Sequence, residues 1–348
     1  MLFRNRGIST GLCAAAIALG VTAVSAAEEI KPLADGFPNQ SLRIVVVDNP
    51  GTADSLYATA LVKAAEGLSP VPIKIDHRPD FSTWGTWEAQ AWMEQQGDAS
   101  NDGYLMAVFP APGIIIDLLA TDMKKAVGVD LRDFNPVILT ERLPYFLHQR
   151  SDAPWGDTLE DLIKYAKEHP NTVRYISGGP GAGQDAAMKW YLDKLGFTVK
   201  EIIGGNSFER ALAVASKEGD ITVSPPDTIL PHYEAGRLDV LMMAGSEKAP
   251  EPWSKVPSSA SFGLENDPWS TQRGLVVTKA VPKEHRLWLE ALFTKAANDP
   301  EFIKLRKQIP GIQLKVLSGD ETSKLLQNLY DQALPIMKKI GIYWGDKK

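Results

Sequence analysis

The stretch from Val173 to Phe197 holds the residues whose types and spacing are best suited to binding chemistry. A short alternating apolar run leads into a glycine-rich loop, and the loop leads into a helical pattern that ends at Gly196. Backbone N–H groups at a helix start lack internal partners, the helix dipole favours negative charge there, and glycine lets a ligand approach the backbone. The pattern therefore predicts a cradle for an anion. The loop passes through Gly178, Gly179, Pro180, Gly181 and Gly183.

The same stretch is equally compatible with a strand-to-helix turn that needs glycine only for its backbone angles. Two nucleotide-binding signatures are excluded. No Lys-Ser or Lys-Thr pair follows the glycines, as a P-loop requires, and Gly179, Gly181 and Gly183 lack the G-x-G-x-x-G spacing of a dinucleotide site. The loop is thus a candidate anion cradle without a nucleotide signature.

A second strand, loop and helix of the same design lies near the start of the chain. Leu42–Val47 is a continuous apolar run typical of a buried parallel strand. Asp48–Asp54 follows as a polar loop, and Ser55–Leu68 has a helical pattern. The loop contains Pro50, Gly51, Thr52 and Asp54.

Strand and helix patterns alternate along the rest of the chain, which predicts an α/β protein with doubly wound, mainly parallel sheets. The length suits two lobes. Pro136–Gln149 carries two apolar runs split at Arg142-Leu143-Pro144, and Gly274–Thr278 is a returning strand. We expect these segments to cross between the lobes. Lys248–Asp267, rich in Pro and Ser, is typical of a long surface loop.

The N-terminus has the features of a secretory signal peptide over residues 1–26. Arg4 and Arg6 precede an apolar run that ends in small residues around Ala26, and the run is too short to span a bilayer. The single cysteine, Cys13, lies inside this segment, so the mature chain has no disulfide. The segment predicts export to the periplasm.

The charge balance excludes nucleic-acid binding. The formal net charge is −6, and removal of the signal peptide would make it two units more negative because Arg4 and Arg6 are lost. An acidic chain without a basic run is a poor partner for nucleic acid. Any anion site must therefore be local and built from backbone dipoles.

Other chemistry has little support in the sequence. None of the histidines has a metal-ligand spacing, and we expect most of them at the surface or at helix ends. There is no G-x-S-x-G nucleophile elbow, and neither a cofactor nor a metal is expected. Arg78 could pair with a ligand carboxylate but is better explained as a brace for its loop, whereas Arg273, on the returning strand, is the better ligand candidate.

Three groups of residues together resemble the substrate-binding proteins of tripartite tricarboxylate transporters, also called Bug solute receptors. The first is Ile44–Asp54, where the family has a strand, a Pro-Gly-Gly loop and an Asp. The second is His77-Arg78-Pro79 with Glu88 and Asp102-Gly103-Tyr104. The third is Tyr175–Asp185 with Gly219-Asp220 and the run from Leu230 to Gly236. The likeness covers essentially all of the mature chain.

The resemblance implies a two-lobed, non-enzymatic periplasmic receptor that closes around a small carboxylate and delivers it to a membrane permease. It makes the two loops the two jaws of the site. The positions carried over are Pro50, Gly51, Thr52, Asp54, Ser177, Gly179, Gly181 and Asp185. The implied partners are a small organic acid and the permease subunits of the transporter, and we expect a monomer.

Several departures from the family pattern predict an altered ligand. Pro50 replaces a glycine and removes one N–H donor, and Asp185 stands where a histidine is common. Asp80-Phe81-Ser82-Thr83 replaces a glycine-rich run beside Trp84 and Trp87. The departures also include Ser224 in place of an Asp and Gln272-Arg273 in place of aromatics.

We therefore expect a ligand with one carboxylate, or an amino group, on an apolar or aromatic body that contacts Phe81, Trp84 or Trp87. Core packing is the alternative for these aromatics, and it is favoured for Trp87 and Trp92.

We place lobe 1 at residues 38–141 and 268–348 and lobe 2 at residues 142–267. Two other functions are compatible with the sequence. One is an exported α/β enzyme, such as a hydrolase, with Asp54 or Asp185 as a base. The other is a ligand sensor that presents its closed form to a membrane receptor.

Overall fold

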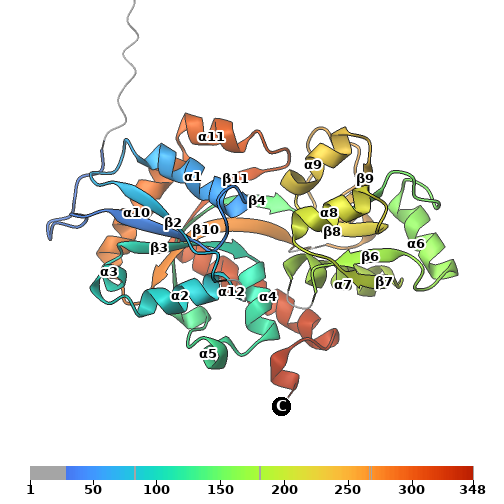
Figure 1. Cartoon of the computed structure of the whole chain (residues 1–348), viewed down its shortest axis with the longest axis horizontal. Coiled ribbons are helices and arrows are strands. Elements are labelled where there is room, and N and C mark those ends of the chain that lie inside the picture. Colours follow the sequence, from blue (N-terminus) through green and yellow to red (C-terminus); the bar gives the residue numbers. More distant parts are fainter. Residues whose placement is uncertain (1–28, 82–83, 180–181, 266, 268, 348) are drawn as a thin grey trace, which may run out of the picture.

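The computed structural model describes residues 29–81, 84–179, 182–265, 267 and 269–347. The predicted signal peptide lies outside these residues. Two β-sheets, each covered by helices on both faces, form two lobes that lie side by side (Figure 1). In the part of the chain that the structure describes, no helix is long and apolar enough to cross a membrane.

The first sheet has the strand order β11-β4-β10-β3-β1-β2. Its outer half contains the parallel pairs of β1 with β2 and with β3, whereas β10 and β11 pair antiparallel with their neighbours. The strands are β1 (Leu42–Val46), β2 (Ile73–His77), β3 (Leu105–Ala111), β4 (Phe134–Pro144), β10 (Ser270–Thr278) and β11 (Gln313–Ser318).

The second sheet has the order β7-β6-β8-β5-β9. β6 pairs parallel with β7 and β8, and β5 pairs antiparallel with β8 and β9. The strands are β5 (Phe146–Arg150), β6 (Arg174–Ser177), β7 (Lys200–Ile203), β8 (Ile221–Ser224) and β9 (Leu238–Met243).

The lobes are joined where the chain passes between the sheets. Only Tyr145 separates β4 of the first sheet from β5 of the second, and the chain returns to the first sheet at β10 (Figure 1). This confirms the predicted crossing segments. The expectation of mainly parallel sheets is wrong for the strands near the crossing, where β4, β5 and β10 pair antiparallel with their neighbours. Strands that enter or leave a lobe at the crossing run opposite to its β-α-β strands.

Helices cover both faces of each sheet. In the first lobe, α1, α10 and α11 lie on one face and α2, α4 and α12 on the other (Figure 1). In the second lobe, α8 and α9 lie opposite α6 and α7. The helices are α1 (Ala53–Ala65), α2 (Thr86–Glu94), α3 (Asp98–Asn101), α4 (Gly113–Ala120), α5 (Met123–Ala126), α6 (Leu159–Glu168), α7 (Gly183–Leu195), α8 (Ser207–Ala215), α9 (Pro226–Glu234), α10 (Lys283–Ala297), α11 (Pro300–Arg306) and α12 (Gly319–Lys339).

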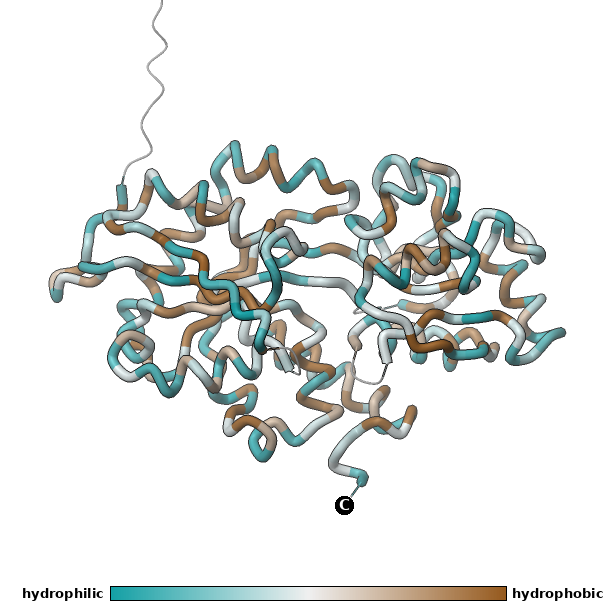
Figure 2. Tube along the Cα trace, in the orientation of Figure 1, coloured by the Kyte–Doolittle hydropathy of each residue, from teal (hydrophilic) through white to brown (hydrophobic). Residues whose placement is uncertain are grey.

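Hydrophobic residues concentrate in the strands and polar residues in the outer turns (Figure 2). The predicted surface loop at Lys248–Asp267 is a partial exception. Trp253 within it is 1% exposed and packs on Phe146 with 4.8 Å between ring centroids. Burying a side chain of this size stabilises the second lobe, so the segment is in part a core element despite its Pro and Ser content.

Local sequence signals account for where the helices begin and end. Thr158 caps α6 by accepting a hydrogen bond from the Asp161 N–H, and Gly196 ends α7 in the left-handed conformation. A reciprocal capping box joins Asn206 and Glu209 at the start of α8. By contrast, α1, α4 and α7 begin without a side-chain cap.

Candidate functional site

The first predicted loop lies between β1 and α1. Pro50 and Gly51 are exposed at its tip, where Gly51 has a φ of 89° that favours glycine. The Gly51 N–H donates to Ser55 Oγ at 3.2 Å, and His77 Nε2 at the end of β2 lies 2.9 Å from the same oxygen. Thr52 precedes the helix without capping it. The first-turn N–H groups of α1 are therefore not claimed by the Thr52 side chain.

The second predicted loop lies between β6 and α7. Ser177 Oγ accepts from the Gly179 N–H at 2.9 Å and donates to Asp185 Oδ1 at 2.5 Å. Tyr175 Oη also donates to Asp185 Oδ1, and Lys189 Nζ donates to Oδ2. Asp185 is 1% exposed, and its carboxylate joins side chains of β6 and α7. Gly181, the remaining predicted position, lies outside the described residues.

The two lobes meet at the N-termini of α4 and α7. A Cβ built on Gly183 would lie 3.7 Å from the Gly113 backbone nitrogen and 3.2 Å from Tyr145 Oη. Both helices start without a side-chain cap, so their positive ends point into the same region. Tyr145 is the single residue between β4 and β5, and sequence reasoning did not select it. Its position at the predicted crossing could have identified it.

Arg273 lies at the junction of both lobes in a buried ionic cluster. Its Nε donates to Asp54 Oδ1 at 2.6 Å and its Nη1 to Glu141 Oε1 at 3.0 Å. Its Nη2 lies 4.0 Å from Asp227 Oδ2 of α9, in the other lobe. Arg306 Nε and Nη2 donate to the two Glu141 oxygens. Arg273 thus holds carboxylates of this protein and is not a free cation awaiting a ligand.

The surroundings of Arg273 carry a surplus of acid. Burial raises the pKa of Asp227, although Arg273 opposes this rise, and Asp227 Oδ1 is buried without a hydrogen-bond partner in the described part of the chain. Burial and the charge of Asp54 raise the pKa of Asp48. Sequence reasoning did not select Asp227, because its approach to Arg273 depends on the tertiary fold. This part of the site disfavours a multiply charged anion.

The predicted aromatic contacts separate into three situations. Trp87 is fully buried, and its indole N–H donates to the Ile114 carbonyl, so it belongs to the core as expected. Phe81 packs beside Trp92, and Arg78 lies over both rings and pairs with Asp80, so Arg78 is a loop brace.

Trp84 is half-buried at the core edge, and its backbone N–H donates to Glu88 Oε2. A Cβ built on the adjoining Gly85 would lie 3.4 Å from Val47, where the first loop begins. Trp84 is therefore the aromatic residue whose chain segment borders the site.

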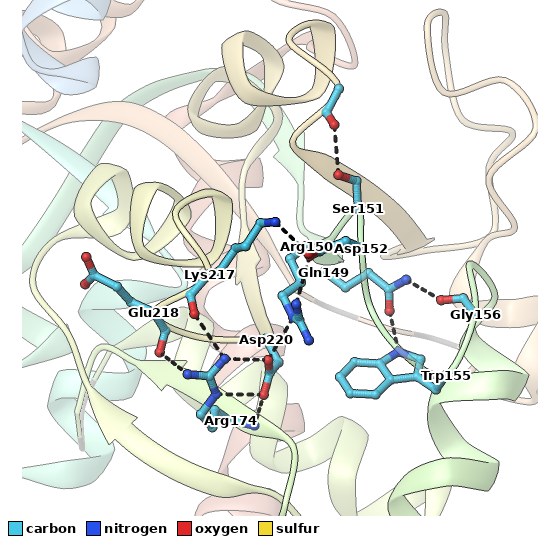
Figure 3. Close-up of polar contacts among 11 residues, drawn as sticks. Gln149, Arg150, Ser151, Asp152, Trp155, Gly156, Arg174, Lys217, Glu218 and Asp220 are labelled. Carbon is cyan, nitrogen blue, oxygen red and sulfur yellow. Dashed lines mark hydrogen bonds and ion pairs between the residues drawn. The ribbon is translucent and has the colours of Figure 1, made fainter.

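Asp220, part of the resembling motif, lies at the opposite end of the second sheet. Its carboxylate accepts from Arg150 Nε at 3.0 Å and from Arg174 Nε and Nη2 at 3.0 and 2.8 Å (Figure 3). It also accepts from the Arg174 N–H. Arg174 in turn donates to the carbonyls of Lys217 and Glu218. Asp220 therefore joins β5, β6 and β8 and has a structural role.

We expect most histidines at the surface or at helix ends. His169 ends α6 and His285 lies in the first turn of α10, whereas His148 departs from the expectation. His148 is fully buried in β5, with Nε2 3.2 Å from Ser224 Oγ. Burial lowers the pKa of His148 to about 3, with help from the charges of His232 and Arg210. His285 lies 2.7 Å from Asp35 Oδ2 and stacks on Phe37. Among the described residues, no group of acids and histidines is arranged to hold a metal ion.

A cavity of about 530 Å³ lies away from the two loops, between α7 and the C-terminal half of α12. It is lined by residues such as Trp190, Leu264 and Ile336. None of the predicted site residues borders it. Although Lys194 and Lys339 line this cavity, the uncapped N-termini of α4 and α7 are the groups near the predicted loops that could recognise an acid.

Comparison with known proteins gives a consistent relationship. The sequence profile described as "Tripartite tricarboxylate transporter family receptor" matches residues 83–342. A protein of Bordetella pertussis, described as a UPF0065 protein, is 24% identical over 310 residues, covering 89% of this chain and 92% of the relative.

Two solved structures share the fold. Rpa4515 of R. palustris with adipate has a TM-score of 0.71 at 19% identity, covering 88% of this chain and 99% of its own. MatC of Rhodopseudomonas palustris with bound malate has a TM-score of 0.68 at 17% identity, covering 86% of this chain and 99% of its own. These similarities support the two-lobed periplasmic-binding-protein architecture. With the family profile matched over most of its length, the chain belongs to the tripartite tricarboxylate transporter receptor family.

Proposed function

We propose that this protein is a periplasmic solute receptor that binds a small organic acid between its two lobes and delivers it to the permease subunits of a tripartite tricarboxylate transporter. The observation that carries the proposal is the approach of two uncapped helix N-termini from different lobes, at Gly113 and Gly183. Groups of this kind bind carboxylates through backbone N–H donors and the helix dipole. The proposed site residues include Pro50, Gly51, Thr52, Ser177 and Gly179.

Closure of the lobes would be a hinge motion at the crossing strands, favoured because a bound acid contacts both lobes at once. In this proposal lobe 1 comprises residues 38–141 and 268–348, lobe 2 comprises residues 142–267, and the protein acts as a monomer. Tyr145 lies at the first crossing, and Arg273 lies on the strand of the second. Their placement supports a hinge at this position.

The proposed ligand has one carboxylate, or an amino group, on an apolar or aromatic body. Dicarboxylates are bound by the relatives Rpa4515, with adipate, and MatC, with malate, which supports the general class of ligand. The acids around Arg273 and the donor lost at Pro50 both weaken a second or third anionic group. Trp84 is the aromatic side chain proposed to contact the ligand body.

Thermal unfolding against a panel of acids tests the proposal. The panel contains aliphatic mono-, di- and tricarboxylates, amino acids and aromatic carboxylates. A ligand at a hundredfold excess over its Kd should add about 2.7 kcal/mol of stability, which is a shift of a few degrees. If no acid in the panel raised the unfolding temperature, the assignment of a carboxylate ligand would be wrong. If citrate bound most tightly and aromatic acids did not bind, the proposed preference would be wrong.

Delivery to the permease needs its own measurement. Uptake of the acid by cells that express the permease should require this receptor, whereas a sensor would change transcription or signalling without changing uptake. A bound acid that is recovered chemically unchanged supports a receptor, and its conversion to a product would support an enzyme instead.

A further inference from the structure

Arg210, in the first turns of α8, is a buried cation that has no ion-pair partner among the described residues. It is 4% exposed, and in the described part of the chain it takes part in no salt bridge. Its Nη1 donates to the Gly205 carbonyl at 2.8 Å, while its Nε is buried without a hydrogen-bond partner. Burial lowers the pKa of Arg210. A buried charge left uncompensated in this way costs a protein stability.

The carboxylates nearest to Arg210 are already engaged elsewhere. Asp185 is held by Tyr175, Ser177 and Lys189, and the Lys189 charge offsets its own. Glu209 accepts from the Asn206 N–H as part of the helix cap. The other buried arginines at the cleft differ from Arg210, because Arg273 and Arg306 both contact Glu141 directly.

The glycines of the second loop make room for this arginine. A Cβ at Gly178 would lie 2.8 Å from Arg210 Nη1, and a Cβ at Gly204 would lie 3.1 Å from Arg210 Cγ. The guanidinium therefore packs against the backbone of the loop that precedes the uncapped N-terminus of α7. An unpaired cation, the loop backbone and a helix N-terminus thus occur together in the second lobe.

We propose that Arg210 supplies the counter-charge for the ligand's carboxylate beside Gly178 and Gly179 in the second lobe. This inference rests on the proposed function and deepens it. The loop dipoles alone would bind any small anion weakly, whereas a guanidinium can donate hydrogen bonds to a carboxylate in a directed way. Arg273 is neutralised by its own carboxylates, so it is less suited to this role than Arg210.

The test compares Arg210→Met with Arg306→Met, which removes a buried arginine that is paired to Glu141 at 2.8 and 2.9 Å. Thermal unfolding of the dialysed proteins is measured first. If Arg210 is kept for the ligand, Arg210→Met unfolds at the wild-type temperature or above it, whereas Arg306→Met unfolds at a lower temperature. If Arg210→Met unfolds as early as Arg306→Met, or does not fold, the inference is overturned.

Affinity is then measured by calorimetry with acetate, malate and adipate, and with adipamide as the uncharged counterpart of adipate. The acid that binds the wild type should bind Arg210→Met about 10- to 100-fold more weakly, and Arg210→Lys should lie between the two. Equal affinity for Arg210→Met and the wild type would overturn the inference. If the wild type binds none of these acids, the result counts against the proposed function, and the unfolding comparison still decides whether the Arg210 charge is structural.

Discussion

Arg273 Nε donates to Asp54 Oδ1 at 2.6 Å, which ties the strand that returns from the second lobe to the first turn of α1. The same guanidinium contacts Glu141 of β4 and approaches Asp227 of α9. Burial acts to lower the pKa of Arg273, but the three carboxylates raise it by more. Arg273 therefore remains a cation. This arginine therefore joins the first loop, both crossing strands and the second lobe.

Replacing Arg273 by methionine should destabilise the protein strongly. The substitution would leave Asp54 and Glu141 buried with fewer cationic partners, and breaking a buried ion pair costs about 3–5 kcal/mol. Urea unfolding at pH 7 measures the loss. The double variant Arg273→Met with Glu141→Gln should recover part of it, because one unpaired carboxylate is removed. Wild-type stability in the single variant would contradict this account of the cluster.

The ion pairs of the second lobe predict a contrast between two aspartates. The pKa of Asp220 lies below its ordinary value. Burial acts to raise it, but the hydrogen bonds and the charge of Arg174 lower it by more. Asp220→Asn should therefore cost on the order of 3 kcal/mol in urea unfolding. Asp152 contacts Arg150 and Lys217 from an exposed position, so Asp152→Asn is the matched control and should change stability little. Equal effects of the two substitutions would contradict the structural role of Asp220.

Buried His148 predicts loss of stability in acid. Its folded pKa of about 3 lies below its ordinary value of 6.5, so the unfolded chain binds the proton more readily. The stability linked to His148 is complete above pH 6.5 and is lost as the pH falls from 6.5 toward 3. At pH 4 the loss is roughly 3 kcal/mol. His148→Met should flatten the dependence of unfolding free energy on pH over this range, and parallel curves for both proteins would contradict the prediction.

The sequence was sufficient for the two loops because their signals are local. A strand, a glycine turn and a helix follow one another directly in both Leu42–Ala65 and Arg174–Leu195, and each element forms close to its expected bounds. The crossing between the sheets was also visible, because Arg142-Leu143-Pro144 interrupts an apolar run.

The roles of single side chains depended on contacts between distant elements. The sequence places Asp185 at the loop, but its hydrogen bonds with Tyr175 and Lys189 are visible only in the structure. Tyr145 could have been selected from its position at the predicted crossing. Arg210 could not, because the absence of an ion pair among the described residues depends on the tertiary fold and is not encoded in local spacing.

The substitution Gly183→Ala should change the affinity for the ligand without a comparable change in the stability of the free protein. Alanine favours a helix interior by about 1 kcal/mol over glycine, whereas a Cβ at Gly183 would require buried Tyr145 to shift slightly. The ligand-free protein should therefore stay within about 1 kcal/mol of the wild type. The added Cβ would lie 3.2 Å from Tyr145 Oη and 3.7 Å from the Gly113 backbone. It would therefore occupy space between the two helix N-termini at which we place the acid.

We expect Gly183→Ala to bind the acid identified by the panel about tenfold more weakly, a change of about 1.4 kcal/mol, with little change in the unfolding temperature of the free protein. Gly67→Ala is the control, because a Cβ at Gly67 would have no atom within 4 Å, and this position follows α1 at the end remote from its first turn. Calorimetry should find wild-type affinity in Gly67→Ala. Wild-type affinity in Gly183→Ala would instead mean that the acid does not use the junction of α4 and α7.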